Sequence, residues 1–190
     1  MKRISVHITA LSAAALALTF MFVVALTTAV TAQPKTPADL DDLEIAHVAY
    51  TADNIDIRYA YLALAKSKNP AVLQFAQTMV NDHTAVNGKA LALLEKLKAS
   101  PKDNFLSKQL NEQADKTVKE MSCLTGKAFD EAYAKNELAY HKAVNVLVGK
   151  TFIPNLKNPE VKALFNEALV IFQAHQQNAE KMVASVAASN

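Results

Sequence analysis

Residues 69–97 read NPAVLQFAQTMVNDHTAVNGKALALLEKL, and this stretch decides the fold. Its apolar residues recur at alternating steps of three and four, which is the spacing of one face of an α-helix. Asn69 and Pro70 are typical of a helix start, because an Asn side chain caps the first backbone amides and proline fits the first turn. The pattern predicts an amphipathic helix that runs to about Ala99. Its apolar face consists of Val72, Phe75, Ala76, Met79, Val80, His83, Val86, Ala90, Leu93, Leu94 and Leu97.

The same helical spacing continues on both sides of this stretch, and period-two strand patterns are absent after residue 38. Further helices are predicted at about 39–66, 105–123 and 127–148, and from Pro159 towards the C-terminus. Breaks at Ser100-Pro101 and Thr125-Gly126, a helix stop at Gly149, and the second Asn-Pro pair at 158–159 separate them. Four long amphipathic helices and one short helix specify an all-α four-helix bundle made of two helical hairpins.

The composition bounds the class of protein. The chain has 190 residues, of which 51% are apolar, and 20 Lys and Arg stand against 18 Asp and Glu. This is enough apolar material for one core, so a disordered tail is excluded and a single domain is expected. The net charge of +2 is too small to indicate a nucleic acid as partner. The one cysteine, Cys123, is expected to be buried and inert.

The first 32 residues have the pattern of a secretory signal peptide. Lys2 and Arg3 precede a long apolar run without charged residues, and the run ends in Val-Thr-Ala at 30–32, small residues at the spacing of a cleavage site. We expect cleavage after Ala32, a short polar leader over 33–38, a bundle domain over 39–190 and a periplasmic or secreted location. An uncleaved anchor is the alternative, because the run approaches the roughly 20 residues that span a bilayer.

Polar side chains on apolar faces are the informative residues of such a bundle. His83 and His175 lie on the apolar stripes of their helices, His141 lies on a largely apolar flank, and Asp56 lies on a face of alanines. At about 1.5 Å per residue, these four positions share one layer if the two hairpins have their turns at the same end. The donor set suits Zn, Cu or Fe. We therefore predict a transition-metal site formed by Asp56, His83, His141 and His175.

Other interpretations of these residues stay open. Histidines on apolar faces are often partnered core residues, and Asp56 would then stiffen the first hairpin by a hydrogen bond to His83. A carboxylate-bridged di-iron centre needs two Glu-x-x-His pairs, and the chain has only Glu44-x-x-His47. Glu137, four residues before His141, fits ordinary pairing on a helix surface.

No motif for catalysis stands out. The chain has no Gly-rich phosphate loop and no Gly-x-Ser-x-Gly elbow, and Cys123 has no recognisable histidine partner. Met79, Met121 and Met182 fit core positions, and the lysines around residues 89–102 fit a solvated face. We expect no catalytic residues and a protein that acts by binding.

Several motifs resemble those of a large group of bacterial exported domains of unknown function. The quoted stretch contains Phe-Ala-x-x-Met-Val-x-Asp-His at 75–83, and the segment 126–133 reads Gly-x-x-Phe-Asp-x-x-Tyr. Asp56 with Leu62-Ala63, His141 and His175 extend the similarity over about residues 39–183. The family's acidic position in the first helix is usually Glu, and here it is Asp56.

This resemblance implies a ferritin-like bundle in the bacterial envelope, without an established activity. Members are often labelled predicted outer membrane proteins, yet after the signal no segment of this sequence is long and apolar enough to span a bilayer. Our leading hypothesis is an exported helical bundle that binds a transition metal. A structural or stress-related envelope protein without metal is the alternative, and a redox enzyme with a dinuclear centre is a third.

Overall fold

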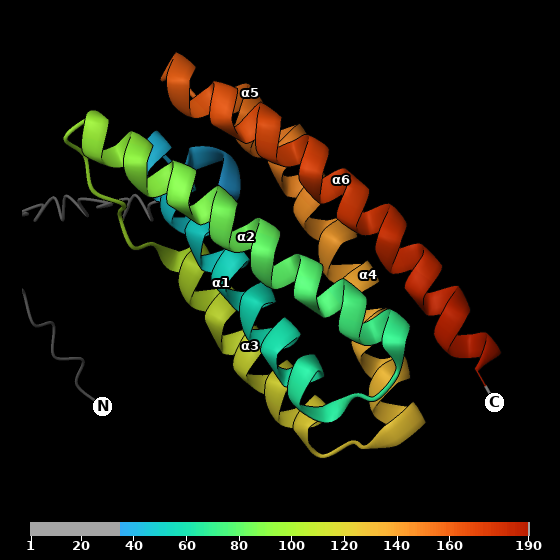
Figure 1. Cartoon of the computed structure of the whole chain (residues 1–190). Coiled ribbons are helices and arrows are strands. Elements are labelled where there is room, and N and C mark those ends of the chain that lie inside the picture. Colours follow the sequence, from blue (N-terminus) through green and yellow to red (C-terminus); the bar gives the residue numbers. More distant parts are fainter. Residues whose placement is uncertain (1–34, 190) are drawn as a thin grey trace, which may run out of the picture. The chain divides into compact units, whose positions relative to one another are not determined.

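The computed structural model describes residues 35–189, and within them every regular element is helical (Figure 1). The all-α prediction is therefore confirmed for this part of the chain. The predicted signal peptide and the first two residues of the predicted leader lie outside the described residues. The elements are the short 3₁₀ turn η1 (Pro37–Asp39), α1 (Asp42–Lys66), α2 (Pro70–Lys96), α3 (Phe105–Ser122), α4 (Gly126–Leu147), the π-helical turn η2 (Val148–Phe152), α5 (Ile153–Asn155) and α6 (Pro159–Ala188).

The helices begin where capping chemistry places them. The side chain of Asn69 accepts a hydrogen bond from the backbone amide of Ala71. The side chain of Asn158 accepts from the amides of Glu160 and Val161. Each asparagine side chain thus pairs with backbone amides that have no partner within the helix. The two predicted Asn-Pro starts are thus confirmed.

The helix ends differ from the prediction at Gly149. A glycine stops a helix by adopting a positive φ, and among the described glycines only Gly126 does so, with φ of 55°. The backbone instead continues through η2 and α5 to Asn155. The predicted stop at Gly149 is wrong, because nothing at this glycine turns the chain out of its helical path.

The four long helices form two antiparallel pairs, α1 with α2 and α4 with α6, and α2 lies beside α6 while α3 lies along α1 (Figure 1). The two pairs do not turn at the same end. The carboxylate of Asp42, at the start of α1, accepts hydrogen bonds from the amides of Lys157 and Asn158 in the α4–α6 connection. The α1–α2 turn lies at the other end, 25 residues further along α1.

The assumption of turns at one end is therefore wrong, and α3 is the reason. This helix carries the chain back along α1, so that α4 starts at the end where α1 and α2 are joined (Figure 1). The four polar positions still meet. Each of the four residues lies in the middle part of a long helix, so its depth in the bundle changes little whichever end of the helix carries the turn.

Apolar side chains fill the interior on both sides of this middle layer. One cluster includes Phe75, Met79, Phe129, Met121 and Met182, so the predicted core role of the three methionines is confirmed. A second cluster surrounds the α4–α6 connection and joins it to the start of α1. It consists of the buried residues Leu40, Ile45, Val48, Val148, Phe152, Leu156, Val161 and Phe165, which we call the end cluster.

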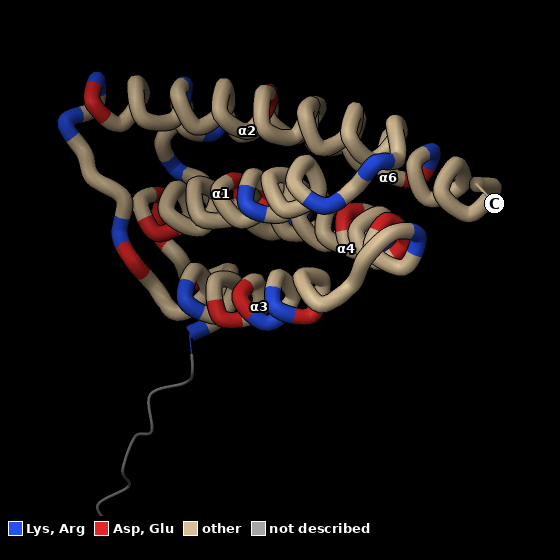
Figure 2. The backbone as a smooth tube through the Cα atoms, turned by 60° about the horizontal axis from the view of Figure 1, so that its bottom comes forward, with Lys and Arg blue, Asp and Glu red and all other residues tan. Residues whose placement is uncertain are grey.

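The surface carries charges of both signs, as Figure 2 shows along α3. The lysines at 89, 96, 98 and 102 are exposed, as predicted. Cys123 is also exposed, which corrects the expectation of a buried thiol. It follows α3 directly, and the inward position of that last turn is taken by Met121. No helix within the described residues is both long and apolar enough to cross a membrane.

Candidate metal centre

His83, in the middle of α2, contacts two carboxylates of α1. Its Nδ1 lies 2.7 Å from Oδ1 of Asp53 in a hydrogen bond. Its Nε2 lies 2.6 Å from Oδ2 of Asp56, but these two atoms are not aligned for a hydrogen bond. The two aspartates are three residues apart, which places them on one face of α1. All three side chains are buried.

His141, on α4, completes a second contact with Asp56. Its Nε2 lies 3.5 Å from Oδ2 of Asp56, again without a hydrogen bond. Its Nδ1 donates to the backbone carbonyl of Glu137 at 3.0 Å. The Glu137 side chain is fully buried, and one of its oxygens lies 3.8 Å from the same Nδ1. Glu137 is therefore an interior residue, and the prediction of ordinary surface pairing is wrong.

His175 reaches the same place from α6. Its Nε2 lies 2.9 Å from Oδ2 of Asp82 on α2, and its Nδ1 has no hydrogen-bond partner. The ring centroid of His175 lies 5.2 Å from that of His83 and 5.3 Å from that of His141. The ring of Phe172, one turn earlier on α6, stacks on His83. Three histidines from three helices thus surround one point beside Asp56.

The hydrogen bonds fix which nitrogen of each ring is free. In a neutral imidazole one nitrogen donates and the other keeps its lone pair. Carbonyl or carboxylate oxygens accept from Nδ1 of His83, Nδ1 of His141 and Nε2 of His175. The opposite nitrogens therefore keep lone pairs in the neutral rings. Protein metal sites use this arrangement, with the outer oxygen holding the ring in place.

Potential metal-ligand atoms that make no hydrogen bond are concentrated at this point. They are Nε2 of His83, Nε2 of His141, Nδ1 of His175, and both carboxylate oxygens of Asp56 and of Glu137, and among them Nε2 of His83 and Oδ2 of Asp56 contact each other as an ion pair. Leaving a buried polar group without a partner costs about 1–3 kcal/mol, and more for a charged group. Ligand atoms of His83, His141 and His175 lie within 4.8 Å of one another, and those of Asp56, Glu137 and His141 do so as well.

The charges of the site are concentrated on one pair. Burial alone would lower the pKa of His83, but the carboxylates of Asp56 and Asp53 raise it to about 10. Burial acts to raise the pKa of Asp56, yet the positive charge on His83 holds it well below its usual range. The metal-free site therefore contains a positive His83 beside a negative Asp56.

The other ligand candidates are neutral in the metal-free protein. Burial raises the pKa of Glu137 well above 4.5, and the charge of Asp56 adds to this effect. Burial lowers the pKa of His141, and it lowers that of His175 to about 4. At neutral pH, a cation that binds here displaces protons from His83 and Glu137 and meets neutral imidazoles at His141 and His175.

The structure brings together all four predicted residues, Asp56, His83, His141 and His175. Sequence reasoning missed the supporting residues Asp53, Asp82 and Glu137. A signal for two of them was present, because Asp53 precedes Asp56 by three and Glu137 precedes His141 by four, so each pair shares a helix face. Asp82 was noted only as part of the Asp-His motif at 82–83, and its contact with His175 was not foreseen because that histidine belongs to another helix.

The Glu44–His47 pair does not join this centre. Glu44 caps the start of α1 and binds Lys35, and Nδ1 of His47 lies 3.9 Å from Asp103. His47 precedes Asp56 by about 2.5 turns of α1 and Glu44 by about 3.3 turns, or about 14 Å and about 18 Å.

The comparison with protein families identifies one match. Residues 25–182 match the family described as a domain of unknown function, DUF4142. This match covers most of the chain, including every residue of the candidate centre. The chain belongs to the DUF4142 family. Neither the comparison with curated proteins nor that with solved structures finds a match.

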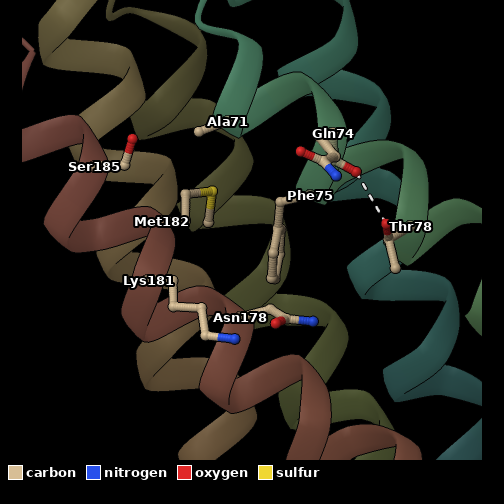
Figure 3. Close-up of a pocket in the computed structure, with 8 residues that line it drawn as sticks. All are labelled: Ala71, Gln74, Phe75, Thr78, Asn178, Lys181, Met182 and Ser185. Atoms are coloured by element: carbon tan, nitrogen blue, oxygen red, sulfur yellow. Dashed lines mark hydrogen bonds between the residues drawn. The ribbon is translucent and has the colours of Figure 1, made fainter.

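In this DUF4142 domain, a pocket of about 310 Å³ lies between the first turns of α2 and the C-terminal part of α6 (Figure 3). Figure 3 shows Phe75 between the two helices, with Lys181 and Asn178 on the side of α6. The ring of Phe75 also meets His141 edge-on, with centroids 6.2 Å apart. The pocket and the histidine cluster are therefore neighbours that share Phe75.

Proposed function

We propose that this protein binds a transition metal ion inside its helical bundle. The ligands are Nε2 of His83, Nε2 of His141, Nδ1 of His175 and a carboxylate oxygen of Asp56, with Glu137 adjacent. The observation that carries the proposal is the meeting of buried donor atoms without partners, on histidines whose other nitrogens are already held by oxygens. If the cluster had only a structural role, these groups would stay unpaired at a cost in stability, whereas one metal ion would bind them together.

The donor set narrows the choice of metal. Three imidazoles and a carboxylate suit Zn²⁺, Cu²⁺ or Fe²⁺, whereas Mg²⁺ and Ca²⁺ prefer oxygen ligands. Around a tetrahedral zinc ion with bonds of about 2.0 Å, ligand atoms lie about 3.3 Å apart. The distance of 2.6 Å between Nε2 of His83 and Oδ2 of Asp56 must therefore widen when one ion binds both atoms.

The proposal also includes the type of bundle and the cellular location of the protein. The arrangement of four long helices with inward imidazole and carboxylate groups supports a ferritin-like bundle. The N-terminal pattern of two basic residues, an apolar run and Val-Thr-Ala supports export to the periplasm or beyond. The protein would then bind metal ions outside the cytoplasm. We propose binding rather than catalysis, because the sequence contains no Gly-rich phosphate loop, no Gly-x-Ser-x-Gly elbow and no recognisable nucleophile pair.

The experiment is metal binding by the purified protein after removal of metals by a chelator. Zn²⁺, Cu²⁺ and Fe²⁺ are added separately, Fe²⁺ without oxygen, and bound metal is measured after gel filtration. We expect about one equivalent of at least one metal. At a hundredfold excess over Kd, binding should stabilise the fold by about 2.7 kcal/mol, which raises Tm by roughly 5–10 °C. Less than about 0.1 equivalent of every metal would reject the proposal.

Variants distinguish this site from adventitious binding at the surface. His83→Ala should abolish the metal-dependent rise in Tm, because it removes one ligand and leaves Asp56 without its partner. His47→Ala is the matched control, since His47 belongs to α1 but not to the cluster, and it should keep the full rise. An unchanged rise in His83→Ala would place the metal elsewhere.

A further inference from the structure

Tyr133 is a buried residue of α4 that the proposed ligand set does not use. Its side chain is fully enclosed, with the ring of Phe129 stacked on it at 6.2 Å and the ring of Phe75 edge-on at 6.3 Å. Its hydroxyl has no hydrogen-bond partner. An unpaired buried hydroxyl costs about as much as a lost hydrogen bond, so its presence in an aromatic cage calls for an acceptor.

The position of Tyr133 on α4 indicates that Glu137 is the acceptor for its hydroxyl. Tyr133, Glu137 and His141 follow each other at steps of four, which places them along one face of the helix. All three are buried, and the next residue towards the ligands is Glu137, whose two carboxylate oxygens are also unpaired. An unpaired donor thus lies one helical turn from two unpaired acceptors.

The other tyrosine of α4, Tyr140, is partly buried and behaves differently. The hydroxyl of Tyr140 donates to the backbone carbonyl of Ala52 at 2.9 Å and holds α4 against α1. Tyr140 therefore has a structural role that is complete without any ligand. On one helix, the partly buried Tyr140 has a paired hydroxyl and the fully buried Tyr133 has an unpaired one, and this contrast sets Tyr133 apart.

We propose that Tyr133 is a positioning residue of the metal centre, whose hydroxyl donates a hydrogen bond to the Glu137 carboxylate when that carboxylate faces the bound ion. This inference rests on the proposed function. A carboxylate beside a metal ion acts only as an acceptor, and an outer donor fixes which of its oxygens faces the ion. The hydrogen bond orients Glu137 and shields its remaining charge inside the apolar core.

The test uses Co²⁺ as the probe, because its visible absorption reports the number and geometry of its ligands. The full chain is compared with Tyr133→Phe, and Tyr140→Phe serves as the matched control. Tyr133→Phe should lower the affinity for Co²⁺ about tenfold, which is at the lower end of the effect of outer-shell residues, and should change the Co²⁺ spectrum. Tyr140→Phe should leave affinity and spectrum within twofold of the unchanged protein.

The stability of the metal-free protein is a second measurement, and it should rank the two variants in the opposite order from the Co²⁺ affinity. Without metal, Tyr133→Phe should be at least as stable as the unchanged protein, since it removes an unpaired hydroxyl, whereas Tyr140→Phe should be less stable. A purely structural role for Tyr133 predicts the reverse, a less stable metal-free protein with unchanged affinity. A Tyr133→Phe variant that fails to fold would overturn the inference for the same reason.

A double-mutant cycle assigns the effect to Glu137. In a Glu137→Gln background, Tyr133→Phe should change the Co²⁺ affinity by less than twofold, because the acceptor carboxylate is gone. An undiminished tenfold loss would overturn the assignment. If the unchanged chain binds no Co²⁺, Zn²⁺, Cu²⁺ or Fe²⁺, the proposed function and this inference fall together. If it binds Co²⁺ and Tyr133→Phe binds it equally, only the inference falls.

Discussion

The end cluster and the middle layer of the bundle differ in what fills them. The end cluster contains only apolar side chains, and two of its rings, Phe152 and Phe165, meet edge-on with centroids 6.5 Å apart. The middle layer, by contrast, contains three buried carboxyl groups and three imidazoles, and several of their atoms make no hydrogen bond. Both regions are equally inaccessible to solvent, so burial alone does not explain the difference.

This comparison indicates that the two regions have different roles. Apolar packing stabilises the fold by removing surface from water, at about 25 cal/mol per Å². The middle layer gives up that gain and carries the cost of unpaired polar groups. A marginally stable bundle keeps such a layer at the expense of stability, which is typical of a site that binds a ligand.

The largest expected effect tests the end cluster. Phe152→Ala removes a fully buried ring and should lower the free energy of unfolding by about 3–5 kcal/mol. Denaturation in urea measures this loss. The number of metal ions bound by the folded variant should not change, because the end cluster contributes no ligand. A loss below about 1 kcal/mol would mean that this end of the bundle is not a packed core.

The next effect tests the middle layer through pH. Burial acts to lower the pKa of His83, but Asp56 and Asp53 raise it to about 10, so His83 holds a proton at pH 6–8; burial raises the pKa of Glu137, so this carboxyl also binds its proton more tightly than a free one. A metal ion must displace these protons, and displacement becomes easier as the pH rises. The affinity for Zn²⁺ should therefore increase between pH 6 and 8, about tenfold per pH unit for each proton released.

Calorimetry in two buffers of different ionisation enthalpy counts the released protons at one pH. The His47→Ala variant provides the comparison, because it should release the same number as the unchanged protein. An affinity that does not vary with pH would contradict the assignment of His83 as a ligand.

A smaller effect separates stability from binding at Glu137. Because burial and the charge of Asp56 favour the protonated, neutral form of this carboxyl, Glu137→Gln is close to isosteric, and the metal-free variant should differ by less than about 1 kcal/mol at pH 4, below the ordinary pKa of a glutamate. The pH profile has a definite sign. A group whose folded pKa is raised favours folding most at low pH, so the unchanged protein should lose stability relative to the variant as the pH rises above about 4.5. Parallel profiles of unfolding free energy would show that Glu137 is ionised in the fold.

The smallest effect concerns His47, outside both regions. Its Nδ1 lies 3.9 Å from a carboxylate oxygen of Asp103, which is largely exposed. His47→Ala should change the free energy of unfolding by no more than about 0.5 kcal/mol and leave Zn²⁺ binding intact. A lost metal site in this variant would move the centre towards the start of α1.

The sequence by itself determined the helices and their inward faces. Periodic apolar residues and the two Asn-Pro starts predicted the four long helices, because helix formation and capping depend on residues only a few positions apart. The four candidate ligands were predicted for the same reason, since a polar residue on an apolar stripe is visible in one helix at a time.

Only the tertiary structure decided the direction of the pairs and the surroundings of the ligands. The reversal by α3 placed the two hairpin turns at opposite ends, which no local pattern indicates. The oxygens that hold His83 and His175 come from other helices, and Glu137 is buried beside Asp56 of α1 once the helices are packed. These properties depend on contacts between residues far apart in the chain, and such contacts exist only once the helices are packed.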